Sequence, residues 1–146
     1  MIEVRRTTSA SPEAVWRVLA DGWSYPSWVV GASRMRSVAA GWPAAGAELH
    51  HSLGVWPLLI DDVTRVLAAV PERELRLRGK GWPLGEVEIH LVLRRTESGG
   101  CEIVMREDAV AGPSTLIPKP LRVLMMKRRN AEATQRLAYL AEGSAR

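Results

Sequence analysis

Apolar and polar residues alternate along much of the chain up to residue 109, and this period of two predicts β-strands joined by short turns. The alternation is clearest over 85–95, where every second residue from Val87 to Leu93 is apolar. One apolar and one hydrated face are typical of an antiparallel sheet that is covered on one side only. The predicted strands span 2–8, 32–38, 47–53, 58–70, 74–80, 85–95 and 101–109.

Two short helical segments are expected after the first strand. Ser11 can cap the free amides at the start of a helix, and Pro12 suits the first helical position. The negative charge of Glu13 interacts favourably with the positive end of the helix dipole. This helix should end by residues 21–22, and a second short helix or turn is expected around 25–28. Trp16 is expected in the core.

A long helix is predicted from about residue 121 to 142, after the stop signal of Pro118, Lys119 and Pro120. Its core-facing stripe recurs every three or four residues. The stripe consists of Val123, Met126, Asn130, Ala133, Leu137 and Leu140. Asn130 is the single polar member, so the middle of the helix presents an amide toward the sheet.

One long helix can cover the apolar face of such a sheet best when the sheet curves around the helix. The expected architecture is therefore α+β, with about seven antiparallel strands wrapped around a C-terminal helix and two short helices after the first strand. Such curvature leaves a cavity between sheet and helix. The length of 146 residues fits one domain spanning 1–146.

This order of elements, with Ser-Pro-Glu-Ala-Val-Trp at 11–16 and Tyr-Pro-Ser-Trp at 25–28, resembles the START-like helix-grip superfamily, also called SRPBCC. The superfamily includes polyketide cyclases and dehydrases, lipid-transfer START domains and birch-pollen-allergen-like proteins. The resemblance covers essentially the whole chain and implies the helix-grip fold with a small apolar molecule in its cavity. Since only some members catalyse a reaction and their key residues differ, it transfers no catalytic residues.

The composition narrows the choice of compartment and partner. A single cysteine, Cys101, permits no internal disulfide, and no secretory signal or membrane-spanning stretch is visible, so we expect a cytoplasmic protein. Seven basic and two acidic residues in 119–146 give +5 there, which leaves −1 for the rest of the net charge of +4. Nucleic-acid binding usually needs a stripe of lysines and arginines with aromatic residues between them. This chain has a basic C-terminal segment and a nearly neutral remainder, so no nucleic-acid partner is expected.

Most signatures of catalysis or cofactor binding are missing from the sequence. It has no glycine-rich phosphate loop, serine nucleophile elbow, zinc-peptidase helix or Cys-x-x-Cys pair, and we expect no cofactor. His50 and His51 are adjacent on one strand and point to opposite sides, so they cannot chelate one metal ion. The functions that remain are acid–base catalysis and binding without catalysis.

Three residues are candidates for acid–base catalysis. His51 faces the cavity if Leu49 and Leu53 do, and the alternative is a structural histidine. Asp62 is the inward member of the pair 61–62, unless both are solvated. Glu107 continues an inward face of the last strand and needs a partner there, for which Asn130 or Arg122 are the candidates. A shift of one residue in register would exchange His51 for His50 and Asp62 for Asp61.

A second set of residues is expected to bind a ligand. Asn130 needs a partner, which is either a ligand oxygen or a neighbouring strand. Large flat side chains beside turns suit the rim of a cavity, and methionines suit a deformable wall, although both also fill cores. The candidates are Trp28, His50, Trp56, Trp82, Met105, Met126 and Asn130.

The leading hypothesis is a protein that binds a small apolar molecule, aromatic, polyketide-like or lipid-like, and that cyclises or dehydrates it if it is an enzyme. The alternative is a carrier or sensor without catalysis. A third interpretation assigns the basic helix to an acidic surface or nucleic acid. For Lys127, Arg128 and Arg129 the alternatives are a solvated face, which needs no function, and contact with an anionic lipid headgroup or a carboxylate at the cavity mouth. The sequence leaves open whether the protein is an enzyme and whether it forms an oligomer, such as a homodimer.

Overall fold

The computed structural model describes residues 2–30, 32–53, 60–81 and 85–144. The expected order of strands and helices is confirmed. The elements are β1 (Ile2–Thr8), α1 (Pro12–Ala20), η1 (Gly22–Ser24), α2 (Tyr25–Trp28), β2 (Ala32–Val38), β3 (Glu48–Leu53), β4 (Ile60–Val70), β5 (Glu74–Gly81), β6 (Gly85–Arg95), β7 (Cys101–Ala111), η2 (Pro113–Leu116) and α3 (Lys119–Ser144). The short 3₁₀ turns η1 and η2 were not anticipated.

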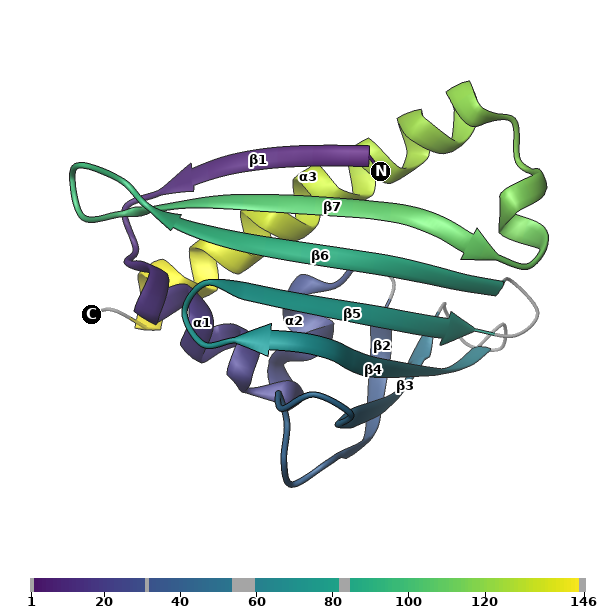
Figure 1. Cartoon of the computed structure of the whole chain (residues 1–146), viewed down its shortest axis with the longest axis horizontal. Helices are drawn as coiled ribbons and strands as arrows, with labels where there is room; N and C mark the ends of the chain where they lie inside the picture. Colours follow the sequence, from purple (N-terminus) through teal and green to yellow (C-terminus); the bar gives the residue numbers. More distant parts are fainter. Residues whose placement is uncertain (1, 31, 54–59, 82–84, 145–146) are drawn as a thin grey trace.

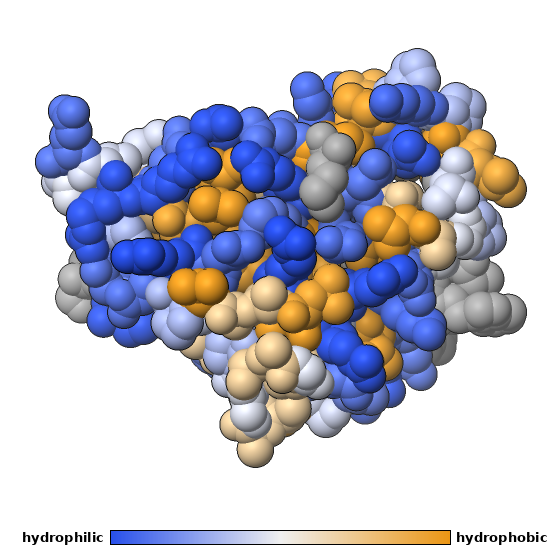
Figure 2. Space-filling model, viewed as in Figure 1, coloured by the Kyte–Doolittle hydropathy of each residue, from blue (hydrophilic) through white to orange (hydrophobic). Residues whose placement is uncertain are grey.

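The seven strands form one antiparallel sheet in the order β1-β7-β6-β5-β4-β3-β2. Strands β2 to β7 follow one another as a meander, and β1 closes the far edge by pairing with β7, with Ile2 opposite Glu107. The sheet curves around α3, and α1 and α2 lie on the same side as α3 (Figure 1). Charged side chains cover much of the other face, as the alternation of strand residues predicts (Figure 2).

The helix α1 begins as the sequence predicts. The Ser11 side chain accepts a hydrogen bond from the Ala14 backbone amide, and Pro12 occupies the first turn. Leu19 and Val15 of this helix are buried against the sheet. The local capping chemistry therefore places α1 over the end of the sheet at which the apolar core lies.

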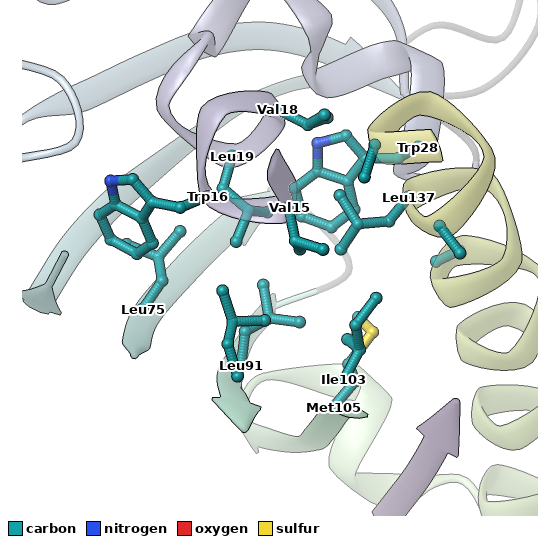
Figure 3. Close-up of a cluster of buried hydrophobic side chains, with 14 of the residues drawn as sticks. Val15, Trp16, Val18, Leu19, Trp28, Leu75, Leu91, Ile103, Met105 and Leu137 are labelled. Carbon is teal, nitrogen blue, oxygen red and sulfur yellow. The ribbon is translucent and has the colours of Figure 1, made fainter. Parts of the chain in front are cut away.

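The apolar core fills the space between α1, α2, the sheet and the second half of α3 (Figure 3). Side chains from all of these elements are nearly inaccessible to solvent, including Val15, Leu19, Trp28, Leu77, Leu91, Ile103 and Leu137. Trp16 is buried as predicted. The cavity among the described residues lies beside this filled end, under the middle of α3.

Two details of the long helix differ from the prediction. The helix α3 begins at Lys119, because Pro120 falls in its first turn, where a missing amide proton costs no hydrogen bond. Leu140 is 36% exposed rather than part of the core stripe. Alternating steps of three and four residues average fewer than 3.6 per turn, so the predicted stripe drifts around the helix, and Ala141 is buried instead.

Candidate functional site

A small polar cavity lies between the sheet and the middle of α3. It has a volume of about 60 Å³. The described residues that line it come from α2 and the segment after it, from β3 to β7 and from α3: Tyr25, Val29, Val30, His51, Asp62, Gly79, Val87, Ile89, Met105, Glu107, Arg129, Asn130 and Ala133. Each of the three predicted catalytic residues is on this wall.

One side of the cavity is a chain of hydrogen bonds centred on Thr64 of β4. Its hydroxyl oxygen lies 2.9 Å from His51 Nε2 and 3.2 Å from the Tyr25 hydroxyl. The rings of Tyr25 and His51 also lie in contact, with centroids 4.8 Å apart and planes tilted by 45°. Residues on three separate elements thus hold the imidazole in a fixed position.

His51 is neutral at pH 7. Burial and, to a smaller extent, the positive charge of Arg36 lower its pKa to about 4. Arg36 donates hydrogen bonds to the backbone carbonyls of both His51 and Asp62, so it lies close behind the pair. A neutral imidazole with so low a pKa can orient a ligand but is a weak base at neutral pH.

Asp62 lies next to His51, with its Oδ2 at 3.6 Å from His51 Nε2. Burial raises the pKa of Asp62, and hydrogen bonds from the backbone amides of Val63 and Lys80 lower it in part. A carboxyl group with a raised pKa is suited to exchange a proton with a bound molecule.

The opposite side of the cavity holds an ion pair between sheet and helix. Glu107 of β7 is 1% exposed, and its Oε1 accepts a hydrogen bond from Nη2 of Arg129 on α3. Its other oxygen, Oε2, has no partner among the described residues. One oxygen of a buried carboxylate therefore remains available to a ligand.

Asn130 presents the most unusual group in the cavity. It is 1% exposed, and neither its Oδ1 nor its Nδ2 has a hydrogen-bond partner among the described residues. An unpaired buried amide costs about 1 to 3 kcal/mol, and native structures rarely retain one without water or a ligand to satisfy it. The cavity thus offers an acceptor and two donors on one side chain.

The structure resolves the choice of register. His51 and Asp62 face α3, whereas Asp61 is exposed and His50 points outward within 3.7 Å of Glu48. The partner of Glu107 is neither Asn130, whose amide has no hydrogen-bond partner among the described residues, nor Arg122, which lies beside Asp108. Arg129, about two turns further along α3, pairs with the carboxylate.

The predicted ligand-binding residues are divided between the cavity, the core and the surface. Met105 and Asn130 line the cavity. Trp28 is not at a rim: it is 2% exposed, packs edge-on against Tyr25 and fills the core, while Met126 is buried but is not among the described lining residues. Trp56 and Trp82 lie outside the described residues.

Three residues of the site were missed from the sequence. Thr64 shares a strand face with Asp62, so the period of two could have identified it. Tyr25 belongs to the motif at 25–28 but had been given no role. Arg129 was read as part of a solvated basic face, and the available clue was that a buried Glu107 requires a cation.

Within the described part of the chain, no cluster of three His, Cys, Asp or Glu residues could hold a metal ion. Within the same part, no helix is long and apolar enough to cross a membrane.

Fold and site together define a helix-grip protein with a small polar cavity between its sheet and its last helix. Over residues 1–142, the sequence matches the family described as polyketide cyclase / dehydrase and lipid transport. The chain belongs to this family, within the SRPBCC superfamily expected from the motifs at 11–16 and 25–28. No curated protein matches the sequence.

Solved structures share the fold at low sequence identity. The Zhui aromatase/cyclase from Streptomyces has a TM-score of 0.75 at 18% identity, with 99% of this chain and 94% of that chain covered. A protein from Rhodobacter sphaeroides has a TM-score of 0.73 at 24% identity, covering 97% and 91%. Ara h 8.0201 has a TM-score of 0.72 at 12% identity, covering 96% of each chain.

Proposed function

We propose that the protein binds a small, largely apolar organic molecule carrying at least one oxygen function in the cavity between the sheet and α3. The observation that carries this proposal is Asn130, whose buried amide has no hydrogen-bond partner among the described residues. A ligand carbonyl or hydroxyl would satisfy it. The family and the aromatase/cyclase among the structural neighbours support an aromatic or polyketide-like ligand.

The lining supports a ligand with two chemically different sides. Val29, Val87, Ile89 and Met105 are apolar and accommodate a ring or chain. Asn130, the free oxygen of Glu107 and the neutral imidazole of His51 lie where polar substituents would be recognised. Trp28 and Met126 do not join this wall, and the ligand would contact aliphatic side chains in their place.

The size of the cavity requires the protein to open for such a ligand. About 60 Å³ holds a couple of water molecules, whereas sites for drug-sized ligands measure about 300 to 1,000 Å³. The ion pair between Arg129 and Glu107 joins helix to sheet beside the cavity, so a larger molecule has to displace Arg129 or move α3.

Catalysis of a cyclisation or dehydration would use Asp62 as the proton-transfer group. The pKa of His51, lowered to about 4, makes it a weak base, while burial raises the pKa of the Asp62 carboxyl. His51 would then orient the molecule, and Glu107 would accept a hydrogen bond from it. The second candidate function is a carrier without catalysis, which the neutral, weakly basic imidazole of His51 also allows.

The test is native mass spectrometry of the purified protein, followed by denaturing extraction of whatever co-purifies. Wild type should retain an organic molecule, and Asn130→Leu should lose it, because the leucine removes both amide partners at similar volume. Leu140→Asn, an amide-for-leucine exchange at an exposed site of the same helix, is the control. An empty wild type that also fails to bind aromatic dyes and fatty acids would refute the proposal.

Catalysis is tested with the extracted molecule as probe. Asp62→Asn should co-purify with the unreacted molecule, and fresh wild type should then remove water from that molecule or, for a cyclisation, convert it to an isomer of equal mass and different chromatographic retention. Binding of this molecule by both proteins, with neither its mass nor its retention changed, would assign the carrier function.

A further inference from the structure

Four large apolar side chains stand in solvent at the start of α3 and in the turn before it. Their exposed fractions are 83% for Leu116, 50% for Leu121, 53% for Leu124 and 54% for Met125. Figure 2 shows apolar side chains among charged ones at the corner where η2 and the first turns of α3 extend past the sheet. Contiguous apolar exposure of this kind marks an interaction surface.

These side chains do not belong to the cavity. At 100° per residue, Leu121, Leu124 and Met125 lie on the side of α3 opposite to Asn130 and Ala133, which face the cavity. The outward apolar face therefore serves a different contact, which is independent of the function proposed above.

Positive charge surrounds this face. The segment 109–131 contains Lys119, Arg122, Lys127, Arg128 and Arg129 and no acidic residue. Arg122 and Arg129 have carboxylate neighbours in Asp108 and Glu107, whereas Lys119, Lys127 and Arg128 are exposed and have no ion pair within the described part of the chain. Lys127 and Arg129 lie on either side of the apolar face of α3. Arg128 lies on the same side of the helix as this face, one turn further along.

A shallow groove of about 480 Å³ runs between this end of α3 and β1, and Lys119, Arg122 and Lys127 line it. Its two acidic residues are neutralised: Glu3 pairs with Arg5 and Arg106, and Asp108 lies beside Arg122. At 100° per residue the helix residues that line the groove lie on the side of α3 opposite to Leu121, Leu124 and Met125, so the groove is separate from the outward apolar face.

We infer that η2 and the first turns of α3 dock onto an anionic phospholipid surface. Leu116, Leu121, Leu124 and Met125 would enter the boundary between headgroups and acyl chains, and the cations would contact lipid phosphates. An apolar face with lysines and arginines along its edges is the pattern of helices that lie in the membrane interface.

Charge argues against the other occupants of this surface. A second copy of the chain in a two-fold dimer would place these same cations opposite each other. Nucleic acid would leave Leu121, Leu124 and Met125 in water, because phosphate contacts use cations and base stacking uses aromatic rings.

The proposal is tested by flotation of the protein with lipid vesicles. We expect binding to phosphatidylcholine vesicles that contain about 30% phosphatidylglycerol, weaker binding at high salt, and none to phosphatidylcholine alone. Lys127→Gln with Arg128→Gln should weaken binding by about 5-fold per cation, or about 30-fold together. The triple change Leu121→Ser, Leu124→Ser and Met125→Ser should reduce binding to background.

Matched variants separate the docking surface from general charge and hydrophobicity. Arg17→Gln with Arg73→Gln removes the same charge from exposed sites elsewhere, and Tyr139→Ser removes an exposed ring from a later turn of α3. Both should bind vesicles as wild type does, and circular dichroism should show all variants folded. Equal loss in the matched variants, absence of vesicle binding, or a dimer that Leu124→Ser dissolves would each overturn the inference.

Discussion

At the scale of single residues, the site brings together side chains whose charges are controlled by burial. His51 is 1% exposed, and Thr64, Tyr25 and Asp62 surround it. Burial raises the pKa of Tyr25 to about 12, so its hydroxyl keeps its proton. The environment thus favours uncharged forms of both rings.

The first prediction concerns the pH dependence of stability. Folding lowers the pKa of His51 from about 6.5 to about 4, so the unfolded chain binds this proton more readily. The contribution of the neutral His51 to the free energy of unfolding is therefore complete above pH 6.5. It declines as the pH falls from 6.5 to 4, by at most about 1.4 kcal/mol per pH unit. Urea unfolding between pH 7 and 4 should show a smaller loss for His51→Gln than for wild type.

The raised pKa of Asp62 acts in the opposite direction, because the folded protein binds that proton more readily. The same comparison in an Asp62→Asn background isolates the histidine. In that background, the free energy of unfolding should depend on pH more steeply with His51 than with His51→Gln. Equal dependence on pH in the two proteins would contradict a buried neutral imidazole.

The second prediction concerns the ion pair of Glu107 and Arg129. Arg129→Met should lower the free energy of unfolding by about 2 to 3 kcal/mol at pH 7, because it leaves a buried carboxylate without its cation. Adding Glu107→Gln to this variant should recover most of the loss. Denaturant unfolding of the two single variants and the double variant measures the coupling, and additive losses would show that the pair is not coupled.

At the scale of elements, α3 performs two tasks along its length. Its second half carries Leu137, Ala138 and Ala141 into the core, while its first half exposes Leu121 and Leu124. The stripe read from the sequence identifies the buried face as far as Leu137. Helical drift then separates the last predicted member, Leu140, from that face.

A pair of leucines on α3 tests this division. Leu137→Ala should cost about 2 to 5 kcal/mol, because the side chain is fully buried. Leu140→Ala, which removes the same atoms at a partly exposed position, should cost well under half as much. Thermal or urea unfolding compares the two, and equal losses would mean that α3 packs in the register of the predicted stripe.

At the scale of the whole molecule, the core and the cavity divide the space under the sheet. The end near α1 is filled by apolar side chains (Figure 3), and the cavity lies between the sheet, the middle of α3, and α2 with the segment after it. The proposed binding of a larger molecule would therefore displace Arg129 or move the first half of α3, while the filled end holds the second half in place.

Hydrogen exchange measures this difference. Backbone amides of 122–130 should exchange faster than those of 134–141 in the free protein, because fewer buried apolar contacts hold the first half. The co-purifying molecule, once bound, should slow exchange in 122–130 selectively. Uniform protection along α3, unchanged by that molecule, would place the opening elsewhere in the protein.

The sequence by itself determined the order of elements, the apolar face of the sheet and the superfamily. These features depend on periodicity, capping residues and local motifs, which neighbouring residues encode. It also indicated that His51, Asp62, Glu107 and Asn130 face the cavity, since a polar group on an apolar face is visible in the pattern, and that Met105 lies on the same inward face as Glu107.

Only the tertiary structure decided which of these groups meet and how much space they leave. Arg129 reaches Glu107, and Thr64 joins Tyr25 to His51, through contacts between elements far apart in the chain. Cavity volume and the burial of Trp28 depend on the curvature of the sheet and on the crossing of α3. Those are properties of packing, and no local pattern specifies them.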